Sequence, residues 1–467
     1  MKNPENIRYV IFLCLIAAFG GFLFGYDTAI ISGTITKVSV QFNLSAIERG
    51  WYVGSALVGS ILGVSVAGTL SDRLGRKPTM YLSAVLFLLS GTWCALSGDF
   101  DALVAGRIVG GSAIGMLSIV CIIYLSEISI AAYRGRMVSF YQLAVTVGFF
   151  SAYLMNYSLI KGTVFASTTN QLIHKVFQVE IWRAMLWTES IPALIFLLLI
   201  FFIPESPRWL ILHSRERDAE KTLRKIYFKT ENIDFQINET KQMKRNNKKP
   251  DIKIIFEPWI FKAVLIGSAI AILGQFMGIN AVLYYGPSIF ESNGLSTGDS
   301  FYFQLLVGTV NVLTTLVAIF LIDKIGRKKL VYVGVTGIFF SLILIGFYFF
   351  KQHDLALSNN FLLYSFLLYI FFCAGSINMV IFVFLSEMYP AKVRGLAMSI
   401  AELSLWFGTY LIGQLTPWLL STLHPAGTFW TFALMCLPYM FIVWKFMPET
   451  TGKSLEDIER FWLTKKK

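Results

Sequence analysis

Apolar residues in this chain fall in long runs that are separated by polar turns. A run of about 20 apolar residues is long enough for one α-helix to cross the hydrocarbon core of a bilayer. Twelve such runs are present, at roughly 9–33, 50–70, 79–97, 101–124, 138–160, 183–203, 259–287, 302–322, 330–350, 361–385, 396–420 and 428–447. The pattern therefore predicts an all-α membrane protein with twelve transmembrane helices.

One long polar segment lies between the sixth and seventh runs. Its first part, SRERDAEKTLRKIY, spaces Leu223 and Ile226 among charged residues in the way an amphipathic helix does. We expect a helical linker on the membrane surface here. The expected organisation is a first half (1–204), the linker (205–257), a second half (258–447) and a tail (448–467).

The composition agrees with a membrane protein. Only 15% of the 467 residues are charged, whereas about 25% are charged in a typical globular domain. One large water-soluble core is therefore excluded. The first apolar run is not followed by a small-residue cleavage site, so we expect it to be a retained span and not a signal peptide.

The basic residues predict the orientation. Of the 40 lysines and arginines, 33 lie on the side that holds both termini and the linker, and six lie on the other side. Because positive loops mark the cytoplasm, both termini are expected there, in the cell membrane or, in a bacterium, the inner membrane. The net charge of +12 then reflects topology and contact with anionic lipids. No soluble basic domain for binding nucleic acid is present.

Three short motifs occur twice, in the same order. GTLSDRLGRK matches FLIDKIGRK, YLSEISIAAYRGR matches FLSEMYPAKVRGL, and PESPRW matches PETTGK. The repeats predict two six-helix halves in parallel topology. Such an architecture is typical of transporters that bind substrate at the membrane midplane between the halves and work by alternating access.

Together with GQFMGINAVLYYGP (274–287), these motifs resemble those of the major facilitator superfamily, and within it the sugar porter family, over nearly the whole chain. FGYDTA (24–29) is similar to the first span of bacterial xylose–proton symporters. The resemblance implies the major facilitator fold and transport of a monosaccharide or polyol. The leading expectation is proton symport; facilitated uniport is the alternative, and a non-transporting sugar sensor is a third, which the short tail argues against.

The repeated motifs place both signs of charge at helix ends on one face. The resemblance implies that these residues pair across the halves and close an inner gate. The alternative is that the charges reflect only topology and the positions of helix ends. Single exposed ion pairs contribute about 0–1 kcal/mol, so only a network could bias the equilibrium. The expected gate residues are Asp72, Arg76, Glu127, Arg134, Glu205, Arg208, Asp323, Arg327, Glu387 and Arg394.

Asp27 is an acid inside the first apolar run, and an ionisable residue at membrane depth indicates a functional site. Arg107 and Glu189 are its candidate partners in other runs. The resemblance implies that Asp27 carries the proton, Arg107 stabilises its charged form and Glu189 competes for Arg107. A purely structural Asp27–Arg107 pair and a role in substrate binding are the alternatives.

A sugar presents hydroxyl groups that both donate and accept hydrogen bonds, and an apolar ring face, so amides and aromatic rings recognise it. The residues that match sugar-contacting positions of the family are Phe24, Gln142, Gln275, Asn280, Tyr284, Asn311, Phe382 and Trp406. For any one amide, a hydrogen bond between helices is the alternative. Gly278 is expected to allow the seventh helix to break.

Three departures from the xylose-type site remove hydrogen-bond donors, so xylose specificity is not expected. Gly274 replaces one amide, Phe382 replaces a tryptophan, and Leu405 stands where an amide precedes Trp406. Two additions are Asn378 and Glu402. Glu402 lies one helical turn before Trp406 and could accept hydroxyl hydrogen bonds or pair with a cationic group; a cytoplasmic lysine or arginine as its partner is the alternative.

Enzymatic chemistry is not indicated. No nucleophile–base set or nucleotide-binding loop is present. The five cysteines all lie in apolar runs and the four histidines are scattered, which predicts neither a metal site nor a disulfide framework. No cofactor is expected, and one chain is enough for the pathway, so the protein is expected to work as a monomer.

Overall fold

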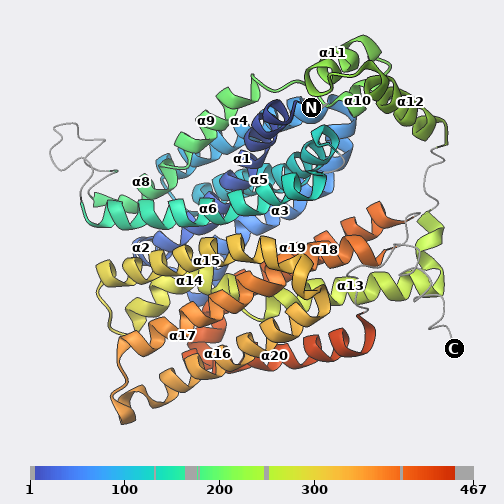
Figure 1. Ribbon diagram of the computed structural model, residues 1–467. Coiled ribbons are helices and arrows are strands. Elements are labelled where there is room, and N and C mark those ends of the chain that lie inside the picture. Colours follow the sequence, from blue (N-terminus) through green and yellow to red (C-terminus); the bar gives the residue numbers. More distant parts are fainter. Residues whose placement is uncertain are drawn as a thin grey trace. The chain divides into compact units, whose positions relative to one another are not determined.

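The computed structural model describes residues 6–130, 133–162, 176, 179–246, 252–389 and 393–447, which are almost entirely helical (Figure 1). Twelve helical segments there are long and apolar enough to cross a membrane. They are Ile7–Gly33, Ala46–Leu74, Arg76–Leu96, Phe100–Ile128, Gly135–Ile160, Ile181–Ile200, Pro258–Ser292, Thr297–Leu321, Arg327–Gln352, Asn359–Ile377, Gly395–Thr422 and His424–Phe446. The twelve predicted spans are confirmed.

Contacts within the chain group the described residues into two compact units. The first unit holds those of 1–30, 58–152 and 167–249, and the second holds those of 31–57, 153–166 and 250–467. The division predicted from the sequence repeats, with its linker and tail, stays a prediction.

The first unit is built around four packed helices. They are α1 (Ile7–Ile30), α4 (Arg76–Leu96), α5 (Phe100–Ile128) and α9 (Ser190–Ile200), with α8 (Ile181–Trp187) leading into α9. Helix α5 packs on α4 and α1, and α9 packs on the same two helices. Parts of α3 (Ala46–Leu74) and α6 (Arg134–Ile160) complete the unit.

Three short helices follow α9, namely α10 (Pro207–Leu212), α11 (Glu216–Ile226) and α12 (Thr230–Asn246). They pack through a small apolar core that includes Trp209 and Ala219. Leu223 and Ile226 are buried, as the amphipathic pattern predicts. The Ile226 carbonyl accepts a hydrogen bond of 2.7 Å from the backbone N–H of Asn6, which ties α11 to the start of the chain.

The second unit contains the remaining helices, with η1 (Ile31–Gly33) and α2 (Ile35–Gln41) from the first part of the chain. Helix α13 packs on α19 and α20, and α16 packs on α17 and α20. The bounds are η4 (Ile252–Phe256), α13 (Pro258–Phe276), α14 (Ile279–Ser292), α15 (Thr297–Ile325), α16 (Arg327–Leu355), α17 (Asn359–Phe372), α18 (Asn378–Met388), α19 (Arg394–Thr422) and α20 (His424–Phe446).

Two spans of this unit are interrupted. The seventh span breaks at Gly278, whose φ of 86° lies in the left-handed region that favours glycine, as the sequence predicts. A Cβ there would lie 2.4 Å from the ring of Phe432. The tenth span changes pitch in a π-helical turn, Cys373–Ile377, between α17 and α18. Such turns are frequent at functional sites, and this one lies next to Asn378.

Candidate functional site

Three ionisable side chains meet in the interior of the first unit. Arg107 Nη1 donates to Asp27 Oδ1 at 2.5 Å and Nη2 donates to Asp27 Oδ2 at 3.3 Å. Glu189 Oε1 lies 3.8 Å from Arg107 Nη1, and that oxygen accepts no hydrogen bond from the described residues. All three side chains are 2–3% exposed. The structure therefore brings together the three residues that the sequence analysis grouped.

Three separate elements position this cluster. Asp27 lies in the last turn of α1, Arg107 lies in the first part of α5, and Glu189 lies at the junction of α8 and α9. The neighbours of the two acids are also joined, since Tyr26 donates a hydrogen bond of 3.0 Å to the Thr188 hydroxyl. This bond joins α1 to the α8–α9 junction next to the cluster.

A glycine beside Arg107 allows this packing. A Cβ on Gly106 would lie 2.7 Å from the sulfur of Cys94, which is tighter than real side chains tolerate. A side chain at this position would therefore have to displace the Cys94 sulfur where α5 packs on α4.

The cluster has more acids than bases. One guanidinium cannot neutralise two carboxylates, and an unpaired charge is costly in a dry interior. The bidentate pairing supports the Asp27 carboxylate, because charge-assisted forks of this kind are strong. A shift of Arg107 across 3.8 Å would transfer that support to Glu189.

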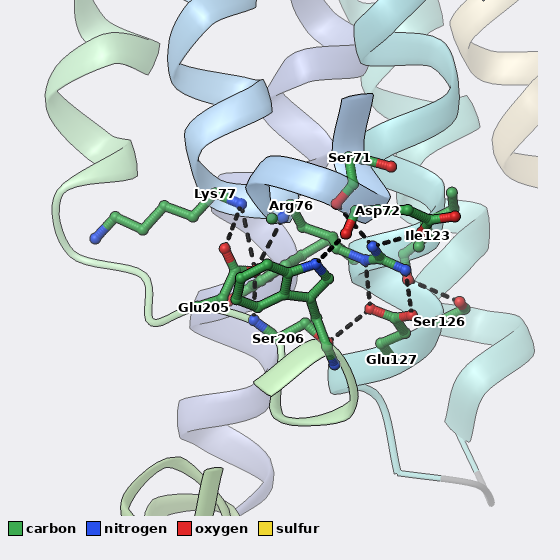
Figure 2. Close-up of polar contacts among 12 residues, drawn as sticks. Ser71, Asp72, Arg76, Lys77, Ile123, Ser126, Glu127, Glu205 and Ser206 are labelled. Atoms are coloured by element: carbon green, nitrogen blue, oxygen red, sulfur yellow. Dashed lines mark hydrogen bonds and ion pairs between the residues drawn. The ribbon is translucent and has the colours of Figure 1, made fainter. Parts of the chain in front are cut away.

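Arg76 is the centre of a second network in this unit (Figure 2). Its guanidinium donates twice to Glu127, at 3.0 Å each, and its Nη1 donates to Asp72 Oδ1 and to the Ser71 carbonyl at 2.9 Å. The Arg76 and Glu127 side chains are 6% exposed. The DRLGRK and SE motifs of the first repeat are thus joined to each other, and the predicted pairing across the halves stays a prediction.

Glu205 caps helix α4 from outside that helix. Its carboxylate accepts hydrogen bonds from the backbone amides of Arg76 and Lys77, the first two residues of α4, at 3.0 and 3.2 Å (Figure 2). The amide of Ser206 donates to it as well, at 2.7 Å. Burial raises the pKa of Glu205, and the three backbone hydrogen bonds oppose that rise. A carboxylate at a helix N-terminus also interacts favourably with the helix dipole.

The lysine of each GRK motif makes the same contact in its own repeat. Lys77 Nζ donates to the carbonyl of Ile203, just beyond α9, at 2.8 Å. Lys328 Nζ donates to the carbonyl of Met447, just beyond α20, also at 2.8 Å. These lysines are not among the predicted site residues, although their place in the repeated motif is a signal that could identify them.

The other predicted gate residues are placed only in part. Arg208 is exposed on α10, and Arg327 is half-buried at the start of α16. Four predicted gate side chains lie outside the described residues, namely those of Arg134, Asp323, Glu387 and Arg394. Their predicted roles stay predictions.

Gln275 joins two helices of the second unit. Its side-chain oxygen accepts from the Asn280 amide at 2.7 Å and from the Thr409 hydroxyl at 3.2 Å. Gln275 lies in the last turn of α13, Asn280 follows the Gly278 break, and Thr409 lies on α19. Thr409 is not among the predicted site residues, although it lies three residues after Trp406 on the same helix.

Glu402 and Trp406 are partners. The Trp406 indole N–H donates to Glu402 Oε1 at 3.2 Å, one turn apart on α19. Trp406 is buried, with 3% of its surface exposed. The alternative in which Glu402 pairs with a basic residue finds no support among the described residues, where no ion pair to Glu402 occurs.

The remaining predicted sugar contacts are divided between the units. Phe24 on α1 and Gln142 on α6 are half-buried in the first unit. Tyr284 on α14 and Asn311 on α15 are each 3% exposed in the second. The side chain of Phe382 lies outside the described residues.

The chain is similar to characterised transporters over nearly its full length. The family model for "Sugar (and other) transporter" matches residues 13–462. The arabinose-proton symporter of Bacillus subtilis and the D-xylose-proton symporter of Escherichia coli are each 34% identical to it, with 99% of this chain and 97% of theirs covered. The glucose transporter GlcP of Staphylococcus epidermidis is 36% identical, with coverage of 97% and 96%.

Solved structures of a related transporter also match this chain over nearly its full length. The proton:xylose symporter XylE bound to 6-bromo-6-deoxy-D-glucose is 33% identical, covers 98% of this chain and 100% of its own, and gives a TM-score of 0.80. The partially occluded inward open conformation of XylE is 31% identical, with coverage of 96% and 100% and a TM-score of 0.82. With its twelve membrane-length helices, this chain belongs to the sugar transporter family of the major facilitator superfamily, and it is a multi-pass membrane transporter and not an enzyme.

Proposed function

We propose that the protein carries a monosaccharide (a pentose or hexose) or a polyol into the cell together with a proton, by alternating access. The names of its relatives support this, since two of them are symporters that couple a pentose to protons. The observation that carries the proposal is the buried cluster of Asp27, Arg107 and Glu189.

Each member of the cluster has a proposed role. Asp27 binds and releases the proton, Arg107 stabilises ionised Asp27, and Glu189 competes for Arg107. When Arg107 moves toward Glu189, Asp27 loses its bidentate partner and becomes easier to protonate, because a nearby opposite charge is what favours the ionised form. Proton affinity then differs between conformations, and this difference couples the proton gradient to sugar movement.

The proposed sugar contacts are side chains from each unit. Phe24 and Gln142 serve in the first unit, whereas Gln275, Asn280, Tyr284, Asn311, Phe382 and Trp406 serve in the second. The Gln275 oxygen already accepts two hydrogen bonds, so its NH₂ group is the part that is left to donate to a sugar hydroxyl. The Arg76 network and the other predicted gate residues would stabilise one of the two access states.

The proposed orientation in the membrane rests on the positions of the basic residues. We place both termini and the helices α10 to α12 in the cytoplasm, on the side where basic residues are concentrated. The protein then lies in the cell membrane, the inner membrane in a bacterium, with anionic lipids near its basic loops. One chain is sufficient for the pathway, and we propose neither an oligomeric requirement nor a nucleic-acid partner.

The direct test is sugar-evoked proton uptake by the purified protein in proteoliposomes, with a panel of pentoses, hexoses and inositols. The expected result is a pH change inside the vesicles with at least one sugar. Entry of labelled sugar without proton movement would instead identify a facilitated uniporter. Failure of every compound to enter would overturn the proposed substrate class.

A further inference from the structure

Glu402 is a carboxylate at membrane depth that the proton-coupling cluster does not use. It lies in the first third of α19, inside the eleventh span. Its one described hydrogen bond is the indole N–H of Trp406. A carboxylate in such a place is costly unless it meets a positive charge or a set of donors.

Ser268 lies at the same depth as Glu402. Ser268 precedes Gln275 by seven residues on α13, and Glu402 precedes Thr409 by seven residues on α19. Seven residues are two helical turns, so each residue lies on the face of its helix that carries the Gln275–Thr409 hydrogen bond. The seventh and eleventh spans run in the same direction, because three spans, an odd number, lie between them.

The Ser268 hydroxyl oxygen is buried and has no hydrogen-bond partner among the described residues. Buried hydroxyls are normally hydrogen-bonded, so this orphan group marks a position where a partner is missing. We call the hydrogen-bonded residues Gln275, Asn280 and Thr409 the Gln275 layer. Two turns from this layer, the second unit holds a carboxylate and a hydroxyl, both of which can accept hydrogen bonds.

The chemistry of this layer is different from that of the Gln275 layer. Amides both donate and accept, which suits neutral hydroxyl groups. Glu402 only accepts when it is ionised, and its neighbour Trp406 has the aromatic ring that best attracts cations. A protonated amine is donor-only, carries the opposite charge and matches both features.

We propose that the preferred substrate is an amino sugar or amino polyol, whose ammonium group binds Glu402 beside Trp406 while its hydroxyl groups bind the Gln275 layer. This deepens the proposed function and rests on it. Glu402 is then a specificity-determining residue, and the missing counter-charge in the protein is supplied by the substrate.

Three related sugars test the inference on the full-length protein in nanodiscs. Binding of D-glucosamine, D-glucose and N-acetyl-D-glucosamine is measured by calorimetry at neutral pH, where most of the free amine is still protonated. Glucosamine is expected to bind at least about tenfold more tightly than glucose, because hydrogen bonds to charged groups contribute more than neutral ones. The uncharged N-acetyl derivative should lose this advantage.

The variant Glu402→Gln keeps the shape of the side chain and removes its charge. It should bind glucosamine about tenfold more weakly and glucose within about twofold of the wild type. Glu257→Gln is the matched control, since Glu257 also accepts from an indole N–H, that of Trp259 at 3.0 Å, but is exposed and precedes α13. It should change neither affinity.

Equal binding of glucosamine and glucose by the wild type would overturn the inference, even if Glu402→Gln does not fold. An equal loss for both sugars in Glu402→Gln would also overturn it, because it would assign Glu402 to a hydroxyl group. Failure of the proposed function has a different signature. If no sugar evokes proton uptake but glucosamine binds through Glu402, coupling fails and the inference stands.

Discussion

Arg107 donates a hydrogen bond to Asp27 from each of its two terminal nitrogens, while Glu189 lies just beyond hydrogen-bond reach of the same guanidinium. This asymmetry defines one state of a three-residue arrangement. In this state Arg107 pairs with Asp27, and Glu189 is close enough to compete for Arg107. A purely structural ion pair would not need the second buried carboxylate.

Asp27→Asn should abolish uphill sugar uptake and leave exchange of labelled sugar intact. The amide keeps the shape of the side chain but cannot carry a proton. The measurement compares proton-driven accumulation with counterflow in the same proteoliposomes. Asp99→Asn is the control, because Asp99 is an exposed N-cap of α5 and asparagine caps equally well. Loss of both activities with normal sugar binding would move Asp27 from coupling to conformational change.

Arg76→Lys should lower the free energy of unfolding by about 1–3 kcal/mol, because lysine cannot reproduce the planar fork that reaches Glu127, Asp72 and the Ser71 carbonyl. Thermal unfolding in detergent measures the change. Arg215→Lys is the matched control, since Arg215 also donates twice to one acid, Asp218, but is 57% exposed. Equal effects at the two sites would argue against a special role for the buried network.

Gln275→Ala should weaken binding of any transported sugar by about tenfold, through loss of one hydrogen bond and disorder of its two partners. Calorimetry with the sugar that evokes proton uptake measures the affinity. Gln352→Ala, near the end of α16, provides a control outside the proposed site. Unchanged affinity in Gln275→Ala would exclude Gln275 from the site.

Leu405→Gln should increase the affinity for xylose, since it restores an amide directly before Trp406. The expected gain is about fivefold, the value of one modest hydrogen bond. Binding of xylose and of glucose is compared in the variant and the wild type. An equal gain for both sugars would show a general effect on the site, and no change would locate selectivity elsewhere.

Gly278→Ala should destabilise the protein by about 1–2 kcal/mol or more, because alanine is strained in the left-handed region and its Cβ would collide with Phe432. The melting temperature reports the loss. Gly98→Ala is the control, since a Cβ on Gly98 has no described atom within 4 Å and its backbone is not left-handed. Equal melting temperatures for the two variants would contradict a required break at Gly278.

Much of the membrane architecture could be predicted from the sequence. The number of spans follows from run length, because a helix needs a fixed number of residues to cross the apolar layer. The break at Gly278 was predictable, since glycine is the residue that tolerates a left-handed backbone. The burial of Leu223 and Ile226 was predictable as well, because an amphipathic pattern depends only on the spacing of neighbouring residues.

The sequence also identified Asp27, Arg107 and Glu189, because charged residues are rare at membrane depth and stand out by type alone. It did not determine which acid holds the arginine. Asp27 and Arg107 are 80 residues apart, and the pairing depends on how α1, α5 and the α8–α9 junction pack.

Only the tertiary structure decided the partners of Glu205 and Glu402. Glu205 caps α4 through backbone amides, and such contacts leave no signature in residue type. Glu402 left three alternatives open in the sequence; the structure gives it the indole of Trp406 and leaves a buried hydroxyl, Ser268, at the same depth. Hydrophobic periodicity determines where helices lie, whereas the packing of their faces determines which polar groups meet.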